Sequence, residues 1–501
     1  MCRISQPYYL ILVKTTISNN LLPTIRQLYL KNSFLVFLSL QNSNFLTQTD
    51  TIVALSTAVG KGAIAVIRLS GPEAIAIANQ IFHGKNLTEQ ATHTLHFGTI
   101  RHEGKIIDEV VVSLFIAPHS YTKENIVEIS CHGSDYIVEQ IIKLTLQHGA
   151  RLAQAGEFTK RAFLNGQLDL AQAEAVADLI ASDSRLSHEV AMKQMRGGFS
   201  QEIKNLRAQL IHFASLIELE LDFGEEDVEF ADRSALQNLI YQIQKLIRDL
   251  LQSFEFGNVI KHGVPVVIVG KPNAGKSTLL NVLLNEEKAI VSDVAGTTRD
   301  IIEDEISIEG ISFRFIDTAG LRETTDKVEA IGVERTLKKV EEASLVIYLF
   351  DVQTTSPADL QREIQALELP ENITLLAVAN KIDTLDLTNL AAYRAIVDCI
   401  AISAAGKKGI EHLKQNLLEK VRGHKLDTAD QTIVTNLRHY QNLQQTYTAL
   451  DDVLNGINLS ITNDFLAADI RRALYSLGEI TGEITTDDLL DNIFSKFCIG
   501  K

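Results

Sequence analysis

Residues 270–277 read GKPNAGKS and match the phosphate-binding pattern G-x-x-x-x-G-K-[ST]. The glycines allow the backbone to wrap phosphates, and the lysine, Lys276, would neutralise the β- and γ-phosphates of a nucleotide. The hydroxyl of Ser277 would reach Mg²⁺. The apolar run VPVVIV precedes the motif and TLLNVLLN follows it, as expected for a strand that leads through the loop into a helix.

Three further segments follow in the order that a GTPase requires. VSDVAGTTRD offers Thr298 as the switch threonine for Mg²⁺ and the γ-phosphate. ISFRFIDTAG places Asp317 at a strand end near the metal shell, and the backbone of Gly320 would sense the γ-phosphate. AVANKID then supplies Asn380, Lys381 and Asp383.

The carboxylate of Asp383 could accept hydrogen bonds from N1–H and the N2 amine of guanine, two donors that adenine lacks at those positions. ISAAG would provide the backbone loop under guanine O6. The predicted nucleotide is therefore GTP. The candidate GTP-binding residues are Asn273, Ala274, Gly275, Lys276, Ser277, Thr278, Ser292, Asp293, Val294, Ala295, Gly296, Thr297, Thr298, Asp317, Thr318, Ala319, Gly320, Asn380, Lys381, Asp383, Ser403, Ala404 and Ala405.

One position differs from Ras-like switches, in which a glutamine after the D-x-x-G glycine orients the attacking water. Leu321 stands there, so another group must position the water. Asn273 brings a neutral amide beside the phosphates, where it could help to hold a monovalent cation. Alternatively, Asn273 only stabilises the turn of the loop.

The elements around these motifs predict a multidomain fold of α/β and α parts. Residues 50–164 alternate strands and helices, including the strand GAIAVIRLS, and predict an α+β domain. Residues 165–262 carry apolar stripes at helical spacing, typical of bundle core. Residues 263–424 predict a mainly parallel sheet covered on both faces. Residues 425–501 return to helix, which predicts one helical domain interrupted by the α/β domain.

Composition limits the other functions that the chain can have. The 501 residues carry a net charge of −16, which disfavours direct binding to nucleic acid except through a local basic patch or a partner. Four scattered cysteines without a C-x-x-C pair give neither a disulfide framework nor a zinc motif, and a reducing compartment fits them best.

The first 49 residues contain no Asp or Glu, only four cations, and an apolar run, FLVFLSL, too short to span a bilayer. We expect an unstructured extension and a cytoplasmic protein without stable membrane insertion. The alternative is an organelle transit segment, which would place the protein in the mitochondrial matrix.

Motifs on both sides of the GTPase block resemble the MnmE (TrmE) family of tRNA-modifying GTPases. The resemblance covers about residues 50–501. It rests on DTIVALSTAVGKGAIAVIRLSG, SYTKENIVEISCHG, GEFTKRAFLNGQLDLAQAEAVADLI and the tail GEITGEITTDDLLDNIFSKFCIGK.

This resemblance implies a folate-binding amino-terminal domain that dimerises the protein, and a helical domain into which a Ras-like G domain is inserted. It implies an FAD-containing MnmG-like partner, joined in a heterotetramer, and tRNA as the substrate. Together the proteins would install aminomethyl or carboxymethylaminomethyl groups at C5 of the wobble uridine. The one-carbon unit would come from 5-formyl- or methylene-tetrahydrofolate. The acidic balance fits a partner that carries much of the RNA contact.

By position, the resemblance assigns Arg68 and Glu128 to the folate site, for the glutamate carboxylate and the pterin ring. Otherwise they are an ordinary strand arginine and a sheet-edge carboxylate. A family folate contact that is often lysine falls on Gln167, where any ion pair is lost. The tail makes Lys501 a folate contact and Gly500 the hinge for its approach. Cys498 is either a thiol nucleophile or general acid near the one-carbon unit, or an inert packed cysteine.

For hydrolysis, the resemblance implies stimulation by K⁺ through G-domain dimerisation. The K⁺ ligands would be Asn273, Ser292, Val294 and Thr297, and Mg²⁺ would be held by Ser277 and Thr298. Glu329 matches the glutamate that positions water, although it could be only a solvated carboxylate at a helix start. The catalytic candidates are Glu329, Lys276, Thr298 and Cys498.

Two other functions compete with this one. A switch GTPase of ribosome assembly shares the GKPNAGKS, DTAG and NKID strings but usually adds a basic RNA-binding module. A folate-dependent aminomethyl transferase with a merely regulatory G domain is the third hypothesis.

Overall fold

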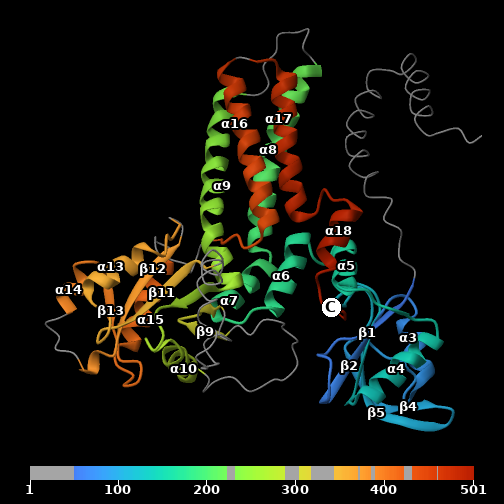
Figure 1. The fold of residues 1–501 in the computed structure, drawn as a ribbon. Coiled ribbons are helices and arrows are strands. Elements are labelled where there is room, and N and C mark those ends of the chain that lie inside the picture. The colour runs from blue at the N-terminus through green and yellow to red at the C-terminus, as the bar shows by residue number, and fades with distance from the viewer. Residues whose placement is uncertain are drawn as a thin grey trace, which may run out of the picture.

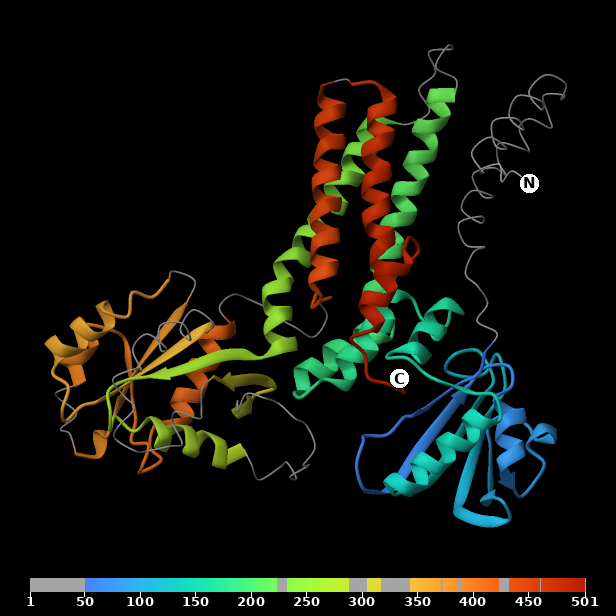
Figure 2. The ribbon, with the colours of Figure 1, turned by 45° about the vertical axis from the view of Figure 1, so that its right-hand side comes forward.

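The computed structural model describes residues 50–222, 232–287, 304–316, 343–370, 373–384, 390–422, 432–459 and 461–500. A bundle of long helices stands at the centre, and two sheet-containing parts lie on opposite sides of its base (Figure 1; Figure 2). The amino-terminal part and the phosphate-binding part are therefore separated in space by the helical part.

The amino-terminal part is built on a seven-stranded sheet with the order β3-β4-β5-β6-β2-β1-β7. Helices α3 (Ala74–Ile81) and α4 (Asp135–Gln147) pack against it through a shared apolar core. Its strands are β1 (Ile52–Leu55), β2 (Gly62–Ser70), β3 (Phe82–His83), β4 (Thr94–His102), β5 (Lys105–Phe115), β6 (Ile126–Gly133) and β7 (Arg151–Leu152). A tight turn joins β4 to β5, and Glu103 and Gly104 in this turn both have positive φ.

Three shorter helices connect this sheet to the bundle: α5 (Glu157–Leu164), α6 (Leu170–Ile180) and α7 (Arg185–Met195). Helix α6 starts sharply at Asp169, whose side chain accepts the amide of Gln172 while the Gln172 side chain accepts the amide of Asp169. The reciprocal cap fixes the direction in which α6 leaves the amino-terminal part.

The bundle consists of α8 (Gly198–Asp222), α9 (Arg233–His262), α16 (Leu437–Asn458) and α17 (Asn463–Thr481). The predicted apolar stripes are confirmed as its core: Leu210 and Ile217 of α8 and Leu236 and Ile243 of α9 are buried together with residues of α16 and α17. Two helices before the α/β part thus pack on two helices that follow it.

The α/β part has a six-stranded sheet with the order β13-β12-β11-β8-β10-β9, parallel except for β9. Apolar clusters lie on both faces, as the continuous hydrophobic runs predict. Its strands are β8 (Val264–Val269), β9 (Asp304–Ile308), β10 (Ile311–Phe315), β11 (Leu345–Asp351), β12 (Thr374–Asn380) and β13 (Cys399–Ala401). Its helices are α10 (Lys276–Glu287), α13 (Pro357–Gln365), α14 (Leu390–Arg394) and α15 (Ile410–Arg422).

The predicted fold class is confirmed: an α+β part, a helical part and an inserted α/β part. After α17, helix α18 (Asp487–Phe494) brings the carboxyl-terminal tail down to α5 and β1 (Figure 1). Within the described ranges, none of the helices combines the length and apolarity needed to cross a membrane.

Candidate functional site

The phosphate-binding loop joins β8 to α10 at the carboxyl edge of the parallel sheet. Gly270 has φ +150°, and an added Cβ would lie 2.0 Å from the carbonyl oxygen of Leu349. At Gly275 an added Cβ would lie 2.3 Å from Nδ2 of Asn380. Both glycines are therefore required for close approach of neighbouring segments, which keeps the loop tight enough to present backbone amides to phosphates.

The structure describes two side chains of the loop that the sequence assigns to the nucleotide, those of Lys276 and Asn273. Nζ of Lys276, in the first turn of α10, donates to the carbonyl oxygens of Gly270 and Lys271 at 2.7 and 3.0 Å. The ammonium group therefore points back over the loop, the side from which it would meet phosphates. Asn273 is exposed and has a left-handed φ of +60°, which asparagine tolerates better than most residues. Ser277 and Thr278 lie in the same first turn of α10.

The predicted base-recognition segments meet this loop through Asn380 at the end of β12. Its Nδ2 donates to the carbonyl oxygen of Ala274 at 2.8 Å, and its Oδ1 accepts the amide of Ala404 at 3.0 Å. The side chain is 2% exposed, so both bonds are shielded from water. Asn380 thereby holds the phosphate loop and the residue 403–405 loop together.

Asp383 lies on the adjoining 3-10 turn, η3 (Ile382–Thr384), and is exposed. A hydrogen bond with the side chain of Ser403 lowers the pKa of its carboxyl group. Ser403 is buried and its Oγ also accepts the amide of Gly406 at 3.1 Å. An ionised, accessible carboxylate at this position can accept two N–H donors from a nucleobase. Ala405, in the residue 403–405 loop, is exposed.

The remaining predicted nucleotide residues lie outside the described residues. They are Ser292, Asp293, Val294, Ala295, Gly296, Thr297, Thr298, Asp317, Thr318, Ala319, Gly320 and Glu329. Lys501 of the predicted folate site also lies outside them.

The predicted folate pair is brought together in the amino-terminal sheet. Arg68 of β2 and Glu128 of β6 are register partners, and Nε and Nη2 of Arg68 both lie 2.8 Å from Oε1 of Glu128. The guanidinium group also lies over the rings of Tyr121 and Phe158, 5.8 and 5.7 Å from their centroids. A partly exposed arginine, a carboxylate and two aromatic rings thus share one place on the sheet.

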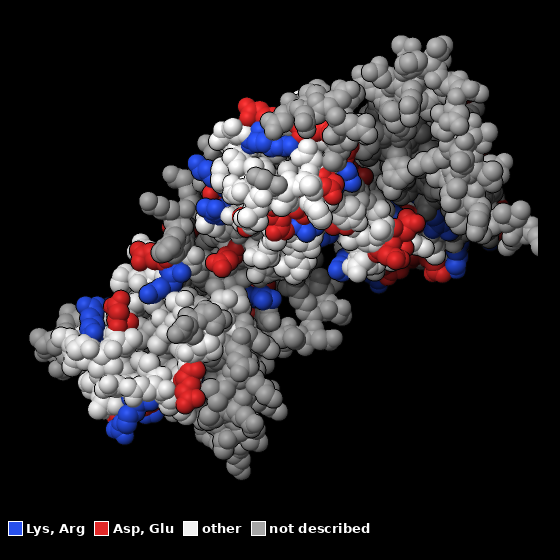
Figure 3. All heavy atoms as spheres, turned by 90° about the horizontal axis from the view of Figure 1, so that it is seen from above, with Lys and Arg blue, Asp and Glu red and all other residues white. Residues whose placement is uncertain are grey.

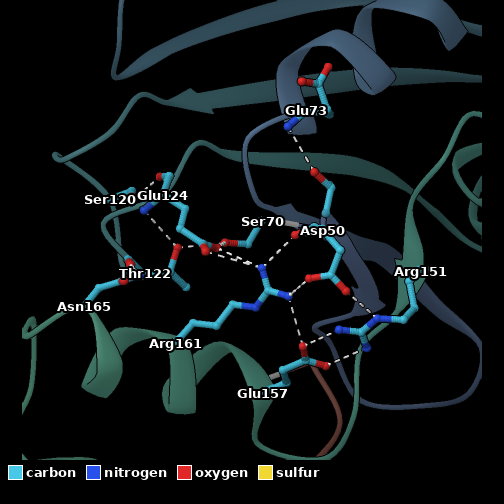
Figure 4. Close-up of polar contacts among 11 residues, drawn as sticks. Asp50, Ser70, Glu73, Ser120, Thr122, Glu124, Arg151, Glu157, Arg161 and Asn165 are labelled. Atoms are coloured by element: carbon cyan, nitrogen blue, oxygen red, sulfur yellow. Dashed lines mark hydrogen bonds and ion pairs between the residues drawn. The ribbon is translucent and has the colours of Figure 1, made fainter. Parts of the chain in front are cut away.

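Helix α5, which carries Phe158, is anchored by a network of ionised side chains (Figure 4). Arg161 of α5 is 2% exposed and lies between the carboxylates of Asp50 (2.7 Å), Glu157 (3.0 Å) and Glu124 (3.3 Å). Arg151 forms a further pair with Glu157 at 2.6 Å and one with Asp50 at 2.7 Å. Burial alone would raise the pKa of the Glu157 carboxyl, but its bonds to Arg151 and Arg161 lower it, so the carboxylate stays ionised.

The same network shapes the loop that receives the carboxyl-terminal tail. Oε2 of Glu157 accepts the amide of Gln154 at 2.8 Å. The next loop residue, Ala155, forms a β-bridge with Ile499, and the amide of Gly156 donates to the carbonyl oxygen of Cys498 at 3.3 Å. Gly156 is thus adjacent both to the tail and, through α5, to Phe158.

The tail makes its second contact with the loop after β1. Oγ of Ser56 donates to the carbonyl oxygen of Gly500 at 3.1 Å. Gly500 has φ +92°, and an added Cβ would lie 2.1 Å from the carbonyl oxygen of Leu55. The thiol of Cys498 is exposed, whereas burial, the larger cause, and Asp108 raise the pKa of the buried Cys131 thiol to about 11. Of these two, only Cys498 is available to a ligand.

Gln167 lies in the segment between α5 and α6. It is exposed, and it follows the carboxyl end of α5, whereas Phe158 lies in the first turn of that helix. Nζ of Lys123 donates to the carbonyl oxygen of Gly166, the residue before Gln167, at 2.8 Å.

Several site residues escape prediction from the sequence. Tyr121, Phe158 and Ser56 lie within SYTKEN, GEFTKR and DTIVALS, three stretches that carry the family resemblance, but neither residue type nor spacing assigned them a role in a site. Asp351 is the last residue of an apolar strand. A carboxylate at the end of such a strand is the one feature of the sequence that could have marked Asp351 as a site residue.

The phosphate loop is joined through Asn380 to the residue 403–405 loop at one edge of a parallel sheet, and this arrangement defines a P-loop GTPase. The family model for the MnmE helical domain matches residues 170–498, and the model for the GTP-binding protein TrmE N-terminus matches residues 51–167. Because the first match alone covers more than half of the chain, the chain belongs to the MnmE family of tRNA modification GTPases. It is therefore a GTP-hydrolysing enzyme that acts in tRNA modification.

Curated relatives align with this chain over nearly their whole length. A tRNA modification GTPase MnmE of Cytophaga hutchinsonii is 61% identical over 456 residues, which cover 90% of this chain and 98% of the relative. The MnmE proteins of Flavobacterium psychrophilum and Bacteroides thetaiotaomicron are 54% and 51% identical, and each alignment covers 90% of this chain and 99% of the relative.

A solved structure of Era in complex with MgGDPNP and nucleotides 1506–1542 of 16S ribosomal RNA is 29% identical. The match covers 37% of this chain and 66% of that one, with a TM-score of 0.24, and at this score the likeness supports no conclusion. Family membership decides against the ribosome-assembly alternative.

Proposed function

We propose that this chain is the GTP-hydrolysing subunit of a complex that adds aminomethyl or carboxymethylaminomethyl groups at C5 of the tRNA wobble uridine. The one-carbon unit comes from 5-formyl- or methylene-tetrahydrofolate. We call Arg68, Glu128, Tyr121 and Phe158 the Arg68 platform. The observation that carries the proposal is the tail contact, in which Cys498 and Gly500 are hydrogen-bonded to the loop before α5 and the loop after β1. A GTPase domain and a candidate one-carbon site therefore share one chain.

The residues around Arg68 fit a reduced folate. A folate has a flat bicyclic ring, an aryl linker and an anionic glutamate end. Tyr121 and Phe158 offer aromatic surface, Arg68 a cation and Glu128 an acceptor for ring N–H groups. Lys501 completes the anion contact in the proposal, and Cys498 acts near the one-carbon unit. Gln167 would contribute at most a neutral amide.

At the nucleotide, Ser277 and Thr298 hold Mg²⁺ in this proposal, and Glu329 positions the attacking water. A K⁺ ion bound by Asn273, Ser292, Val294 and Thr297 supplies positive charge as two G domains of a homodimer meet across the nucleotide. The exposed, left-handed Asn273 supports this assignment, since its amide is free to face a partner domain. Equal hydrolysis rates in sodium and potassium buffers would contradict it.

An FAD-containing MnmG-like protein is the proposed partner, in a heterotetramer that contacts tRNA together. On the face seen in Figure 3, Lys and Arg side chains are interspersed with Asp and Glu over the described residues. Such a mixed surface favours a partner as the source of much of the phosphate contact.

The proposed domains are residues 50–164 for folate binding and dimerisation, 165–262 and 425–501 for the helical domain, and 263–424 for the G domain. Residues 1–49 precede them as an extension, and a cytoplasmic location remains a prediction.

The test is mass spectrometry of wobble nucleosides from cells that lack the protein and are complemented with wild type or with Ser277→Asn. We expect wild type to restore the modified uridine and the variant to fail. Unchanged uridine modification in cells without the protein would overturn the proposal. Normal modification by the Ser277→Asn variant would instead favour the aminomethyl transferase with a merely regulatory G domain.

A further inference from the structure

Asp351, the last residue of β11, lies next to the guanine-recognition segment. It is the register partner of Asn380 on β12 and is 6% exposed. Its Oδ2 accepts Nζ of Lys381 at 2.7 Å, and its Oδ1 accepts the amide of Gln353 at 2.9 Å. Both carboxylate oxygens thus accept a hydrogen bond. One of the donors is Lys381, which lies between Asn380 and the turn that carries Asp383.

The backbone of Lys381 explains why such an anchor is needed. Lys381 has φ +66°, a left-handed conformation that costs a residue with a Cβ about 1 kcal/mol or more. The ion pair holds the side chain across the end of β11 while the backbone makes this bend. A buried carboxylate in turn requires a cation, so each partner restricts the other.

We propose that Asp351 is a positioning residue for the guanine base of GTP and GDP. It fixes the Lys381 side chain and, through the bend at Lys381, the direction in which Asp383 presents its carboxylate. Asp351 does not touch the nucleotide in this proposal. The inference rests on the proposed role of residues 380–383 in base recognition and adds the group that holds them in place.

A purely structural role for Asp351 makes a different prediction, and the fold offers a matched control. The backbone turn after Asp351 is also held by Tyr393, whose hydroxyl donates to the carbonyl oxygen of Thr355 at 2.8 Å. Tyr393→Phe loosens the same turn without changing the pair with Lys381. If Asp351 only stabilises this turn, Tyr393→Phe and Asp351→Asn should weaken nucleotide binding alike.

The experiment measures the Kd and dissociation rate of a fluorescent GDP on the full chain for Asp351→Asn, Lys381→Met, the double variant and Tyr393→Phe. We expect each of the first two to raise Kd about tenfold, the size of one hydrogen bond to a charged group. The double variant should lose no more than either single variant, because both remove the same pair. Tyr393→Phe should bind as wild type does, and kcat at saturating GTP should be retained by Asp351→Asn.

Wild-type affinity in Asp351→Asn, a double variant whose loss equals the product of the single losses, or equal weakening by Tyr393→Phe would each overturn the inference. If Asp351→Asn does not fold, Asp351→Ser keeps an acceptor for Gln353 and is measured in the same way. Asp383→Ala distinguishes a failure of the inference about Asp351 from a failure of the base-recognition role of residues 380–383. Undiminished GDP binding in that variant would contradict the base-recognition role itself.

Discussion

The amide of Gly156 donates a hydrogen bond to the carbonyl oxygen of Cys498, which places the end of the chain against the amino-terminal part. The bond joins the loop held by Glu157 to a tail that begins after α18. The thiol of Cys498, whose carbonyl oxygen accepts this bond, is exposed. Main-chain contacts at Gly156 and Gly500 therefore help to hold the described part of the tail, and a substitution that removes one of them should loosen it.

Gly500→Ala should free the tail. The new Cβ would meet the carbonyl oxygen of Leu55 at 2.1 Å, and alanine disfavours a φ of +92°. We expect faster hydrogen exchange at the Gly156 amide, measured by mass spectrometry on the loop peptide. Gly149→Ala is the control, because Gly149 has φ +102° but open space around its Cβ position. Equal exchange in both variants would argue against the tail contact.

Arg161→Met should destabilise the amino-terminal part strongly. The change leaves the carboxylates of Asp50, Glu124 and Glu157 without their shared buried cation, and breaking such a pair costs about 3–5 kcal/mol. Thermal unfolding would measure the loss of stability, and hydrogen exchange in β1 and α5 would show that the loss lies in the amino-terminal part. Arg185→Met is the matched control, since Arg185 is 82% exposed and its pair with Glu189 should contribute little. A loss no larger than that of the control would contradict the network's role.

Arg68→Lys should weaken binding of 5-formyl-tetrahydrofolate. Lysine keeps the charge but loses the planar group that lies over Tyr121 and Phe158 and pairs with Glu128. We expect Kd to rise about fivefold, the equivalent of roughly 1 kcal/mol. Calorimetry would measure it, with the exposed Arg101→Lys on β4 as control. GTP hydrolysis should be the same in both variants, so a matching loss of hydrolysis would point to general damage.

Glu174 should make the helical part sensitive to acid. Burial by itself raises the pKa of its carboxyl, but His439 and Arg438 lower the pKa to about 2 from an ordinary 4.5. Burial also lowers the pKa of the His439 imidazole, so at neutral pH Arg438 carries the charge of this pairing and His439 contributes through its hydrogen bond to Glu174. The unfolded chain therefore binds the proton first as pH falls. The contribution of Glu174 is complete above pH 4.5 and is lost as pH falls towards 2.

Glu174→Gln tests this directly. The variant should be less stable than wild type at neutral pH, because Arg438 loses the carboxylate at 2.6 Å. The difference in unfolding midpoint, followed by circular dichroism, should shrink as pH falls below 4.5. The exposed Glu189→Gln should show no such convergence. A constant difference between wild type and Glu174→Gln at every pH would contradict the assignment.

The sequence predicts those parts of the structure in which residues close together in the chain determine both the local fold and the chemistry. The loop at Gly270 and Gly275 and the segment from Asn380 are recognisable because a few contiguous residues carry both the fold and the function. The apolar stripe of α9 is equally local. These features need no knowledge of what lies across the molecule.

Long-range partners could not be predicted. Arg161 meets carboxylates from two distant segments, and neither spacing nor composition links Asp50 to Glu124. Asp351 is similar: its role depends on β11 pairing in parallel with β12, which places it beside Lys381. Contacts of this kind follow from the topology, and the topology is fixed only when the whole chain packs.

The most direct test of the central claim uses cells whose only copy of the protein lacks residues 498–501. The claim is that the P-loop domain hydrolyses GTP to drive one-carbon chemistry at the tail, on the far side of the bundle. We predict that the purified truncated protein retains GTP hydrolysis while mass spectrometry finds the wobble uridine unmodified at C5. Modified wobble uridine at the wild-type level in these cells would contradict the account.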